Sequence, residues 1–438
     1  MITNPNVPTW VVINPTTLQI LNLCDGKTTI KKIVKNISEM YKISTHKIRK
    51  DILHAINTLV ENKIIFYKGQ LDAVKKHKTK KKIQLQCAHL YLEITSKCNL
   101  RCKHCYLPVF KQTPNNLTLE EITRVVHDFS EIGGKYITIT GGEPLLHPDW
   151  YKIADICAQS RCSVTLLTNG TLLNKNVVSH LYSKNLFIGV SIGGASARTQ
   201  DYIHGKGSFK KTLKGIDQLL SVYDGSKVAI CFTPMRHNLK DIPKLFEFAS
   251  QRNIGRLHFS LLEKRGRAKA YERLLNLTEK QKITLFKMLY CESLKYGKQI
   301  QVDISQHPNL LTRFAGKTIK YEYPLGETLY ITSSGDVFPS AYIENQEFLL
   351  GNIRSTSIKR IITTNTFKNM FVRWGRRIEK IPACRMCSYK VYCGGGSGAL
   401  ALSQYGTPLI PDEYCHARQE LFNYIVERAA RKWGLINP

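Results

Sequence analysis

Short apolar runs alternate with helical patterns between about residue 88 and residue 305, and this alternation restricts the fold more than any other feature of the chain. One intervening helix is expected to begin at a capping box of Thr118 and Glu121. Six strands alternating with helices indicate parallel βα units, which right-handed crossovers curve into an open or partial barrel. We therefore predict an α/β protein with a partial (β/α)6 barrel over residues 87–305. The runs are HLYLEI, YITIT, SVTLL, LFIGVSI, VAICF and RLHFS.

The segment before the barrel has a different pattern. Residues 1–70 combine the strand-like WVVI with three short helical patterns, the first of which Asn14 can cap, with Pro15 at its first position. This pattern predicts a small winged-helix-like domain. Residues 71–86 are basic and poor in apolar side chains, which is typical of a solvated linker.

The charge composition of the chain limits the classes of binding partner that we expect. The chain has 64 Lys plus Arg against 33 Asp plus Glu, a formal net charge of +31. This excess favours an anionic partner such as nucleic acid, an acidic peptide or an anionic membrane surface, although a lysine-rich proteome would produce the same excess. No apolar run reaches the roughly 18 residues of a membrane span, and MITNPNVPTW lacks the layout of a signal peptide. We expect a cytoplasmic protein that does not enter a membrane.

Three cysteines follow the first predicted strand in KCNLRCKHCY, spaced C-x3-C-x2-C. The carboxyl ends of barrel strands are where active sites gather. Thiolates suit iron–sulfur clusters or zinc, but a closed structural site would use a fourth ligand, and His104 is poorly placed to supply it. One iron of a [4Fe–4S] cube can then stay open for a substrate or cofactor. The three cysteines are Cys98, Cys102 and Cys105.

This motif resembles that of the radical S-adenosylmethionine enzymes, in which three cysteines hold the cube and the amine and carboxylate of S-adenosylmethionine fill the open position. YITITGGEPLLHP supports the resemblance, because Gly141, Gly142 and Glu143 directly follow the second strand, like the family motif that binds the methionine amine. Glycines allow close backbone approach, and a carboxylate can pair with an ammonium.

Further matches are partial. LLTNG after the third strand and VSIGG after the fourth are similar to the ribose and methionine contacts of the family, which implies roles for Thr168, Asn169 and Ser191. Relatives usually have Asp at the position of Gly193, and often Arg at the position of His204. His204 is therefore expected either to contact the carboxylate or only to cap a helix.

A second cysteine cluster lies in residues 306–438, a largely irregular region with a turn at TSSGDVFP and a closing helix after Cys415. Four thiolates in a short region can hold zinc or an iron–sulfur cluster, and spacing alone does not choose between them. We predict a C-terminal iron–sulfur domain. The four cysteines are Cys384, Cys387, Cys393 and Cys415.

This cluster resembles the SPASM domain of radical S-adenosylmethionine peptide maturases, which holds two auxiliary clusters. Ser340, Ser397 and Tyr323 stand where we would place ligands of the first auxiliary cluster, whereas the four cysteines that resemble ligands of the second are intact. The resemblance implies one auxiliary [4Fe–4S] cluster and two clusters in all. The six remaining cysteines are expected to be mostly buried small hydrophobic residues, especially Cys231 in VAICF, although one of them could donate hydrogen to a substrate radical.

Residues 1–70, with LQILNLCDGKTTIKKIV, resemble the peptide-recognition domain of ribosomal-peptide maturases, which binds a leader peptide as an added β-strand. A winged-helix nucleic-acid module has the same helix pattern. The resemblance implies a radical enzyme that forms a carbon–carbon or thioether cross-link in a precursor peptide, supplied with electrons by a flavodoxin- or ferredoxin-type reductant. The basic excess of the chain would suit an acidic leader in that peptide. The alternatives are a peptide epimerase, a nucleic-acid-modifying radical enzyme and a zinc-dependent binding protein.

Overall fold

The computed structural model describes residues 2–3, 10–11, 13–67, 87–107, 116–305, 328–367 and 377–432. The linker predicted at 71–86 and the position Tyr323 lie outside these ranges.

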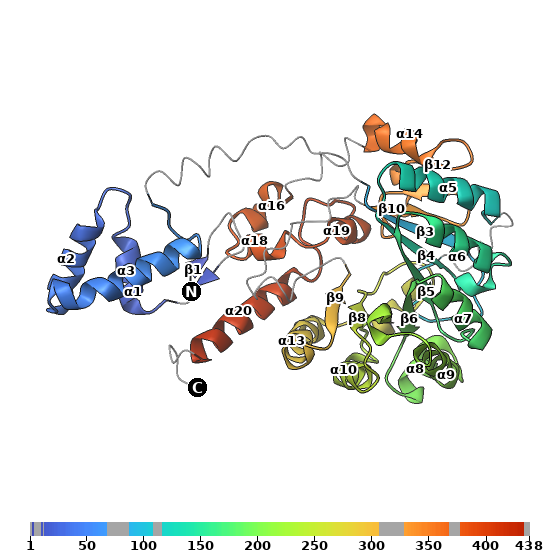
Figure 1. Cartoon of the computed structure of the whole chain (residues 1–438), viewed down its shortest axis with the longest axis horizontal. Coiled ribbons are helices and arrows are strands. Elements are labelled where there is room, and N and C mark those ends of the chain that lie inside the picture. The colour runs from blue at the N-terminus through green and yellow to red at the C-terminus, as the bar shows by residue number, and fades with distance from the viewer. Residues whose placement is uncertain are drawn as a thin grey trace.

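The N-terminal segment has two short strands and three helices, which pack around a small hydrophobic core of their own (Figure 1). Asn14 caps the first helix as predicted, because its side chain accepts a hydrogen bond from the backbone N–H of Thr17 at 2.8 Å. The prediction of a strand followed by three helices is confirmed. The elements are β1 (Ile2–Thr3), β2 (Trp10–Val11), α1 (Pro15–Asn22), α2 (Ile30–Tyr41) and α3 (Thr45–Glu61).

All six predicted barrel strands are present, and sequence neighbours among them pair in parallel. They are β3 (His89–Thr95), β4 (Tyr136–Gly141), β5 (Ser163–Thr168), β6 (Phe187–Ile192), β7 (Val228–Phe232) and β8 (Arg256–Phe259). The predicted α/β fold with a partial barrel is confirmed.

The sheet is longer than the six strands. β9 (Gln301–Ile304) extends it beside β8, and β10 (Thr328–Ile331) pairs in parallel with β3. β11 (Asp336–Phe338) and β12 (Gly351–Asn352) complete a ten-stranded order. The region beyond residue 306 was thus wrongly expected to be irregular, because strands of two to four residues have too little periodicity to be recognised before their pairing partner is known.

Helices cover the outer face of the sheet in Figure 1. The predicted capping box is present, with Thr118 and Glu121 each accepting a hydrogen bond from the other's backbone N–H. The barrel helices are α5 (Leu119–Glu131), η1 (Pro144–Leu146), α6 (Trp150–Gln159), α7 (Lys175–Ser183), α8 (Ala197–His204), α9 (Ser208–Leu220), η2 (Gly225–Lys227), η3 (Leu239–Asp241), α10 (Ile242–Gln251), α11 (Arg267–Ala270), α12 (Glu272–Leu275) and α13 (Glu279–Tyr296).

The C-terminal segment returns to the barrel, since its closing helix α20 (Cys415–Lys432) packs on α13. Lys282 on α13 pairs with Glu413, just before α20, at 2.8 Å, and this pair is almost fully buried. The other helices of this segment are η5 (Gln346–Phe348), α14 (Ile358–Thr363), α16 (Arg377–Lys380), α17 (Pro382–Arg385), α18 (Lys390–Cys393) and α19 (Gly398–Tyr405).

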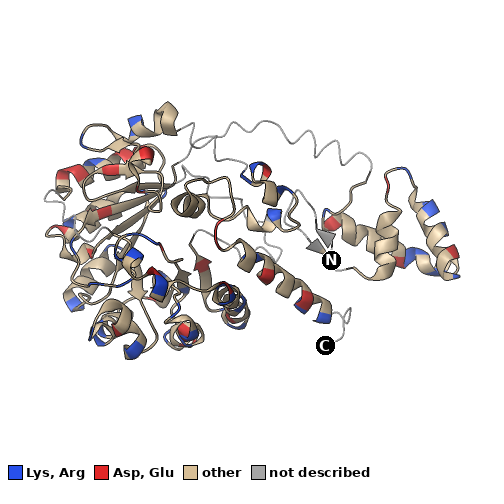
Figure 2. Ribbon diagram, turned by 180° about the vertical axis from the view of Figure 1, so that it is seen from behind, with Lys and Arg blue, Asp and Glu red and all other residues tan. Residues whose placement is uncertain are grey.

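Charged residues of both signs are spread over the outer helices, as Figure 2 shows for the described residues. None of the helices in the described part of the chain combines the length and the apolar character that a membrane crossing requires.

Candidate functional site

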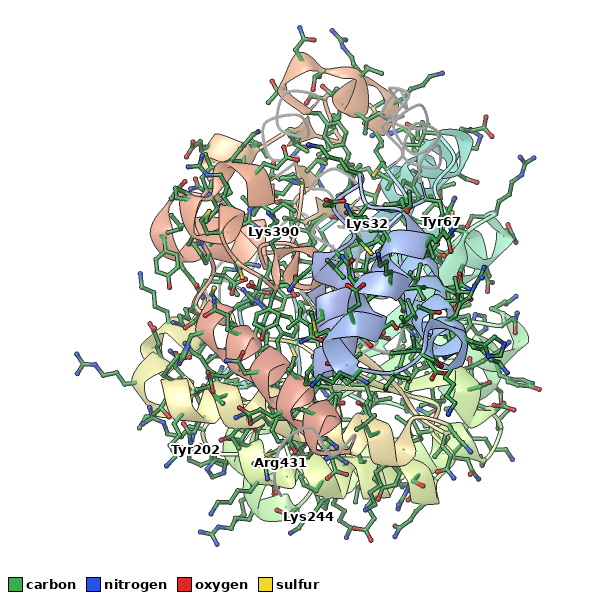
Figure 3. The ribbon with its side chains drawn as sticks, turned by 90° about the vertical axis from the view of Figure 1, so that its left-hand side faces the viewer. Lys32, Tyr67, Tyr202, Lys244, Lys390 and Arg431 are labelled. Carbon is green, nitrogen blue, oxygen red and sulfur yellow. The ribbon has the colours of Figure 1, made fainter. Side chains whose placement is uncertain are left out.

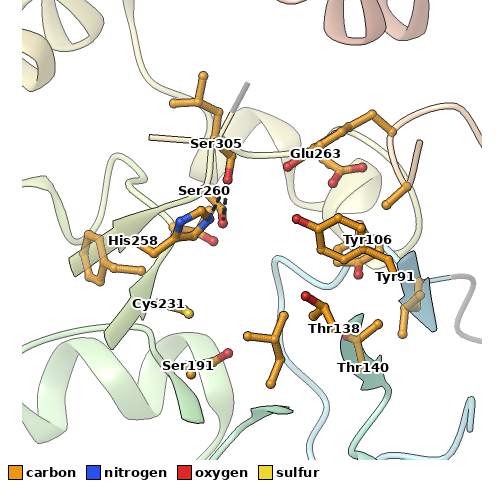
Figure 4. Close-up of a pocket in the computed structure, with 18 of the residues that line it drawn as sticks. Tyr91, Tyr106, Thr138, Thr140, Ser191, Cys231, His258, Ser260, Glu263 and Ser305 are labelled. Carbon is orange, nitrogen blue, oxygen red and sulfur yellow. Dashed lines mark hydrogen bonds between the residues drawn. The ribbon is translucent and has the colours of Figure 1, made fainter. Parts of the chain in front are cut away.

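A cavity of about 1420 Å³ follows the inner face of the sheet. Alternate residues of strands β3 to β10 line it, such as Thr138 and Thr140 on β4, because side chains of a strand point to opposite faces in turn. Their neighbours Ile137 and Ile139 are buried in the hydrophobic core. In Figure 4, Ser191, Cys231 and His258 lie on one side of the cavity, and Tyr91, Tyr106, Thr138 and Thr140 on the other.

The three cysteines of the first motif line this cavity from the loop after β3. Two backbone contacts hold the loop: the Arg267 guanidinium donates to the carbonyl of Cys102 at 2.9 Å, and the N–H of Ala268 donates to the carbonyl of Cys105 at 3.1 Å. Burial, followed by the charges of Cys98 and Cys105, raises the pKa of the Cys102 thiol. Thiols that raise one another's pKa in this way favour a bound cation that keeps them ionised.

Gly141 and Gly142 also line the cavity, and their lack of a side chain lets two loops touch. A Cβ atom on Gly141 would lie 2.3 Å from the Thr95 carbonyl oxygen, and one on Gly142 would lie 2.3 Å from the Lys97 carbonyl oxygen. The N–H of Gly142 donates to the Thr95 carbonyl at 2.8 Å. The glycine pair therefore brings the loop after β4 against the cysteine loop.

Glu143, the third residue of this motif, is held by hydrogen bonds within the protein. It is fully buried and is absent from the cavity wall. Its carboxylate accepts hydrogen bonds from the Thr168 hydroxyl and the Asn169 N–H, both at 2.8 Å, and from the Leu145 N–H at 3.3 Å. Glu143 thus joins the loops after β4 and β5, and in this arrangement its oxygens are already engaged by protein donors.

Thr168, Asn169 and Ser191 lie at the cavity wall near the carboxyl ends of β5 and β6. The Asn169 side chain donates to Asn99 of the cysteine loop at 2.8 Å. The sequence analysis did not single out Asn99, and a lone Asn within a cysteine motif gives no signal of such a contact.

The two departures from the family pattern, Gly193 and His204, are in contact with each other. A Cβ atom on Gly193 would lie 3.0 Å from the His204 ring. This ring ends α8, stacks on His104 at 5.3 Å between centroids, and bonds to the Gln200 side chain at 3.1 Å. Burial lowers the pKa of His104 to about 4 and that of His204 to about 3, so both rings are neutral at pH 7. His204 therefore fills space beside Gly193 that an Asp side chain would need.

Replacing Gly193 with the Asp that relatives usually have should destabilise the protein when His204 is left in place. We expect Gly193→Asp to lower the free energy of unfolding by about 1–3 kcal/mol, because the new side chain must displace a packed ring. The double variant Gly193→Asp with His204→Ala should recover part of this loss, and thermal unfolding of all variants measures it. Equal losses in the single and double variants would contradict a contact between the two positions.

The second cysteine cluster is brought together by three helices. Cys384 lies in α17, Cys393 ends α18 and Cys415 begins α20, while Cys387 lies between α17 and α18. Burial and the charges of the other three thiolates raise the pKa of Cys384 to about 11. The Arg418 Nε donates to the Cys393 sulfur at 3.2 Å. Four converging thiols with a cationic donor beside them fit an iron–sulfur cluster.

Ser340 and Ser397 line the cavity, but their hydroxyls have other partners. Ser397 Oγ accepts from the Leu400 N–H at 3.1 Å and caps α19, and Ser340 Oγ accepts from the Tyr342 N–H at 3.2 Å. Their surroundings therefore do not resemble a ligand set for a further cluster.

The expectation that Cys231 is a buried core residue is wrong. It lies on β7 opposite Ser191 on β6, and its sulfur faces the cavity in Figure 4. Three of VAICF's five side chains point into the core and two point inward to the cavity, so apolar composition alone could not place it. Glu263, in the loop after β8, also lines the cavity and was not singled out from the sequence.

An α/β sheet curved around a cavity, with three cysteines in the loop after its first parallel strand, defines an iron–sulfur barrel enzyme. The model of the radical SAM superfamily matches residues 92–249, that of coenzyme PQQ synthesis protein D matches residues 1–65, and that of the iron–sulfur cluster-binding SPASM domain matches residues 324–388. The chain belongs to the radical SAM superfamily, with a PqqD-like domain at its N-terminus and a SPASM domain at its C-terminus.

Relatives of several kinds are similar to this chain. The AdoMet-dependent heme synthase of Methanosarcina barkeri is 30% identical over 348 residues, which cover 74% of this chain and 94% of that protein. The subtilosin biosynthesis protein AlbA of Bacillus subtilis is 24% identical, over 88% of this chain and 84% of that protein. The crystal structure of Streptococcus suis SuiB bound to precursor peptide SuiA has a TM-score of 0.62 at 16% identity, covering 92% of this chain and 93% of that one.

The radical SAM domain implies a [4Fe–4S] cluster and S-adenosylmethionine, and the SPASM domain indicates auxiliary iron–sulfur chemistry. Within the described ranges, no three His, Cys, Asp or Glu side chains are arranged to hold a single metal ion. The groups implied here are larger four-iron cubes, and two sets of converging thiols at or beside the cavity suit them.

Proposed function

We propose that this enzyme forms a carbon–carbon or thioether cross-link in a ribosomally made precursor peptide. The observation that carries the proposal is the extent of the cavity, which reaches from the loop of Cys98, Cys102 and Cys105 to Cys393 of the second cluster. A peptide segment in this cavity would lie between the two clusters, and an oxidative cross-link needs both a hydrogen abstraction and an electron acceptor.

The comparisons support a peptide substrate. The N-terminal match to PqqD, the name of the bacteriocin-forming relative AlbA and the peptide-bound structure of SuiB agree with it. The name of the heme synthase relative instead suggests a tetrapyrrole, but such a substrate gives no role to the PqqD-like residues 1–65.

The domain boundaries that we propose are those predicted from the sequence. They are a peptide-recognition domain at 1–70, a barrel at 87–305 and a cluster domain at 306–438.

The side chains around the cavity have separate proposed roles. Cys98, Cys102 and Cys105 would hold the first cube, and Gly141, Gly142, Thr168, Asn169 and Ser191 would line the S-adenosylmethionine site, which Glu143 supports from behind. When bound, the cluster and S-adenosylmethionine supply a 5′-deoxyadenosyl radical that takes a hydrogen atom from the substrate. Cys384, Cys387, Cys393 and Cys415 would hold the auxiliary cluster. The cavity wall positions the peptide and excludes water from the radical.

The partners follow from charge and chemistry. Lys31, Lys32 and Lys35 are exposed on α2, and Figure 3 labels Lys32 on the N-terminal helices. These cations suit an acidic leader, whose binding should weaken as salt is added. We further propose a flavodoxin- or ferredoxin-type reductant and a cytoplasmic location, where thiols and clusters stay reduced.

Epimerisation is the second candidate, because Cys231 faces the cavity. Burial raises the pKa of its thiol to about 12, so it carries the hydrogen that a substrate radical would need to recover. Epimerisation needs no net oxidation, however, and would leave the second cluster without a role.

Mass spectrometry separates these functions. A short peptide encoded beside the gene would be co-expressed anaerobically with the enzyme, in ordinary and in heavy water. We expect the peptide to lose two hydrogens, and Cys231→Ala to reduce this product by no more than a few-fold. An unchanged mass with deuterium gained only in heavy water, and lost in Cys231→Ala, would show epimerisation. An unmodified peptide with continued S-adenosylmethionine cleavage would point to nucleic acid or a tetrapyrrole.

A further inference from the structure

Glu263 lies in the loop that follows β8, at the carboxyl end of the sheet where barrel enzymes place their reacting groups. It lines the same cavity as Tyr106 and Tyr342. Figure 4 shows its carboxylate above Tyr106 and Tyr91, across the cavity from His258. A carboxylate in this position faces the space in which a peptide would react.

Only one of its two oxygens has a hydrogen-bond donor in the described part of the chain. Arg265 Nε donates to Glu263 Oε2 at 2.8 Å. Oε1 accepts no hydrogen bond from a described residue, and the side chain is not closed off from the cavity. Oε1 is therefore placed to accept a proton from a bound molecule.

The charges around Glu263 favour the arrival of a proton. Arg265 also pairs with Glu344 and donates to the carbonyl of Ala341, so one cation serves two carboxylates. The other titratable groups near this set are Tyr106, whose ring lies under the Arg265 guanidinium at 4.9 Å, Tyr342, Tyr330 and the buried Glu93. Desolvation raises the pKa of each of the three phenols, so they are neutral at pH 7. Burial also raises the pKa of Glu93, whose oxygens accept hydrogen bonds from Tyr330 and Ser333. Because Arg265 is shared between Glu263 and Glu344, this set contains more carboxyl groups than cations.

Burial raises the pKa of Glu263 to about 7, against the opposing effect of Arg265. Below that pH the carboxyl is protonated and cannot take a proton, and above it the carboxylate can. A base whose pKa lies near the working pH combines availability with proton affinity.

We propose that Glu263 is the catalytic base that takes the proton released as the cross-link forms, an inference that rests on the proposed function. The substrate carbon loses a hydrogen atom to the 5′-deoxyadenosyl radical. The second reacting atom, a thiol sulfur or an aromatic carbon, bonds to that carbon, and its own bond to hydrogen breaks. That proton goes to Glu263 Oε1, and the oxidised auxiliary cluster that Cys384, Cys387, Cys393 and Cys415 would hold would accept the remaining electron. The substrate thereby loses two hydrogens in total.

Glu263→Gln tests this role in the reconstituted holoenzyme. The readout is the ratio of cross-linked peptide to 5′-deoxyadenosine, because hydrogen abstraction does not need the base. We expect the ratio to fall by about 100-fold or more. Glu263→Asp should restore part of it. In the wild type the ratio should rise as the pH passes about 7, and in Glu263→Gln it should stay flat.

Glu344→Gln is the matched control, since Glu344 shares Arg265 but does not line the cavity. Iron content and thermal unfolding would be compared for both variants. A wild-type enzyme that cross-links the peptide, with Glu263→Gln no worse than Glu344→Gln, would overturn this inference alone. A wild-type enzyme that forms no cross-link would overturn it together with the proposed function.

Discussion

Cys98→Ala is expected to abolish the cleavage of S-adenosylmethionine, whereas Cys393→Ala should preserve cleavage and remove the cross-linked product. The first change removes one of the three thiols that line the cavity from the loop after β3. The second change removes the thiol of Cys393, which ends α18 and belongs to the second set of four cysteines. Each variant should lose one cube, so iron should fall from about eight to about four atoms per chain.

Anaerobic iron and sulfide analysis, electron paramagnetic resonance and product chromatography measure these outcomes. Cys157→Ala is the control, because this thiol is fully buried in α6 and lies away from the cavity wall. It should keep both clusters and cleave S-adenosylmethionine at a rate close to that of the wild type. Cleavage lost in Cys393→Ala with the first cube intact would contradict separate roles for the two cysteine sets.

The second large effect concerns a buried ion pair beside the auxiliary thiols. Arg418 is 1% exposed, and its Nη1 donates to Asp412 Oδ1 at 2.8 Å while its Nε donates to the Cys393 sulfur at 3.2 Å. Arg418→Met would leave the Asp412 carboxylate buried without this cation. We expect a loss of about 3–5 kcal/mol in the free energy of unfolding.

Denaturant unfolding of the anaerobic holoenzyme, together with iron analysis, measures this loss. Lys35→Met removes one partner of the exposed pair Lys35–Glu39, 3.7 Å apart, and should cost less than about 0.5 kcal/mol. The double variant Arg418→Met with Asp412→Asn should be more stable than Arg418→Met alone, because the buried charge is gone. Similar stabilities for Arg418→Met and Lys35→Met would show that the buried pair contributes no more to the free energy of unfolding than the exposed pair.

The N-terminal helices and the barrel strands illustrate what local pattern reveals. Asn14 and the Thr118–Glu121 capping box act through bonds between residues close in sequence, so their sequence signals were sufficient. β10 could not be found in this way, because it becomes a strand by pairing with β3, more than two hundred residues earlier in the chain. Such a partner leaves no trace in the periodicity of a four-residue segment.

The residues of the site also differ in how far local sequence spacing predicts them. Motif spacing was enough to put Cys98, Cys102 and Cys105 after the first strand and to separate the four later cysteines as a second set, since the spacing of ligands is itself a local property. The sequence by itself thus determined the fold class, the family and the chemistry that its cysteines suit.

Tertiary structure alone decided which side chains meet. Glu143 turned out to be a buried acceptor between two loops, His204 to occupy the space beside Gly193, and Cys231 and Glu263 to face one cavity. These contacts join strands and loops that are distant in the chain. The inward or outward direction of a side chain on a strand is known only when the sheet has closed and its register is set, because neighbouring positions differ only by the face to which they point.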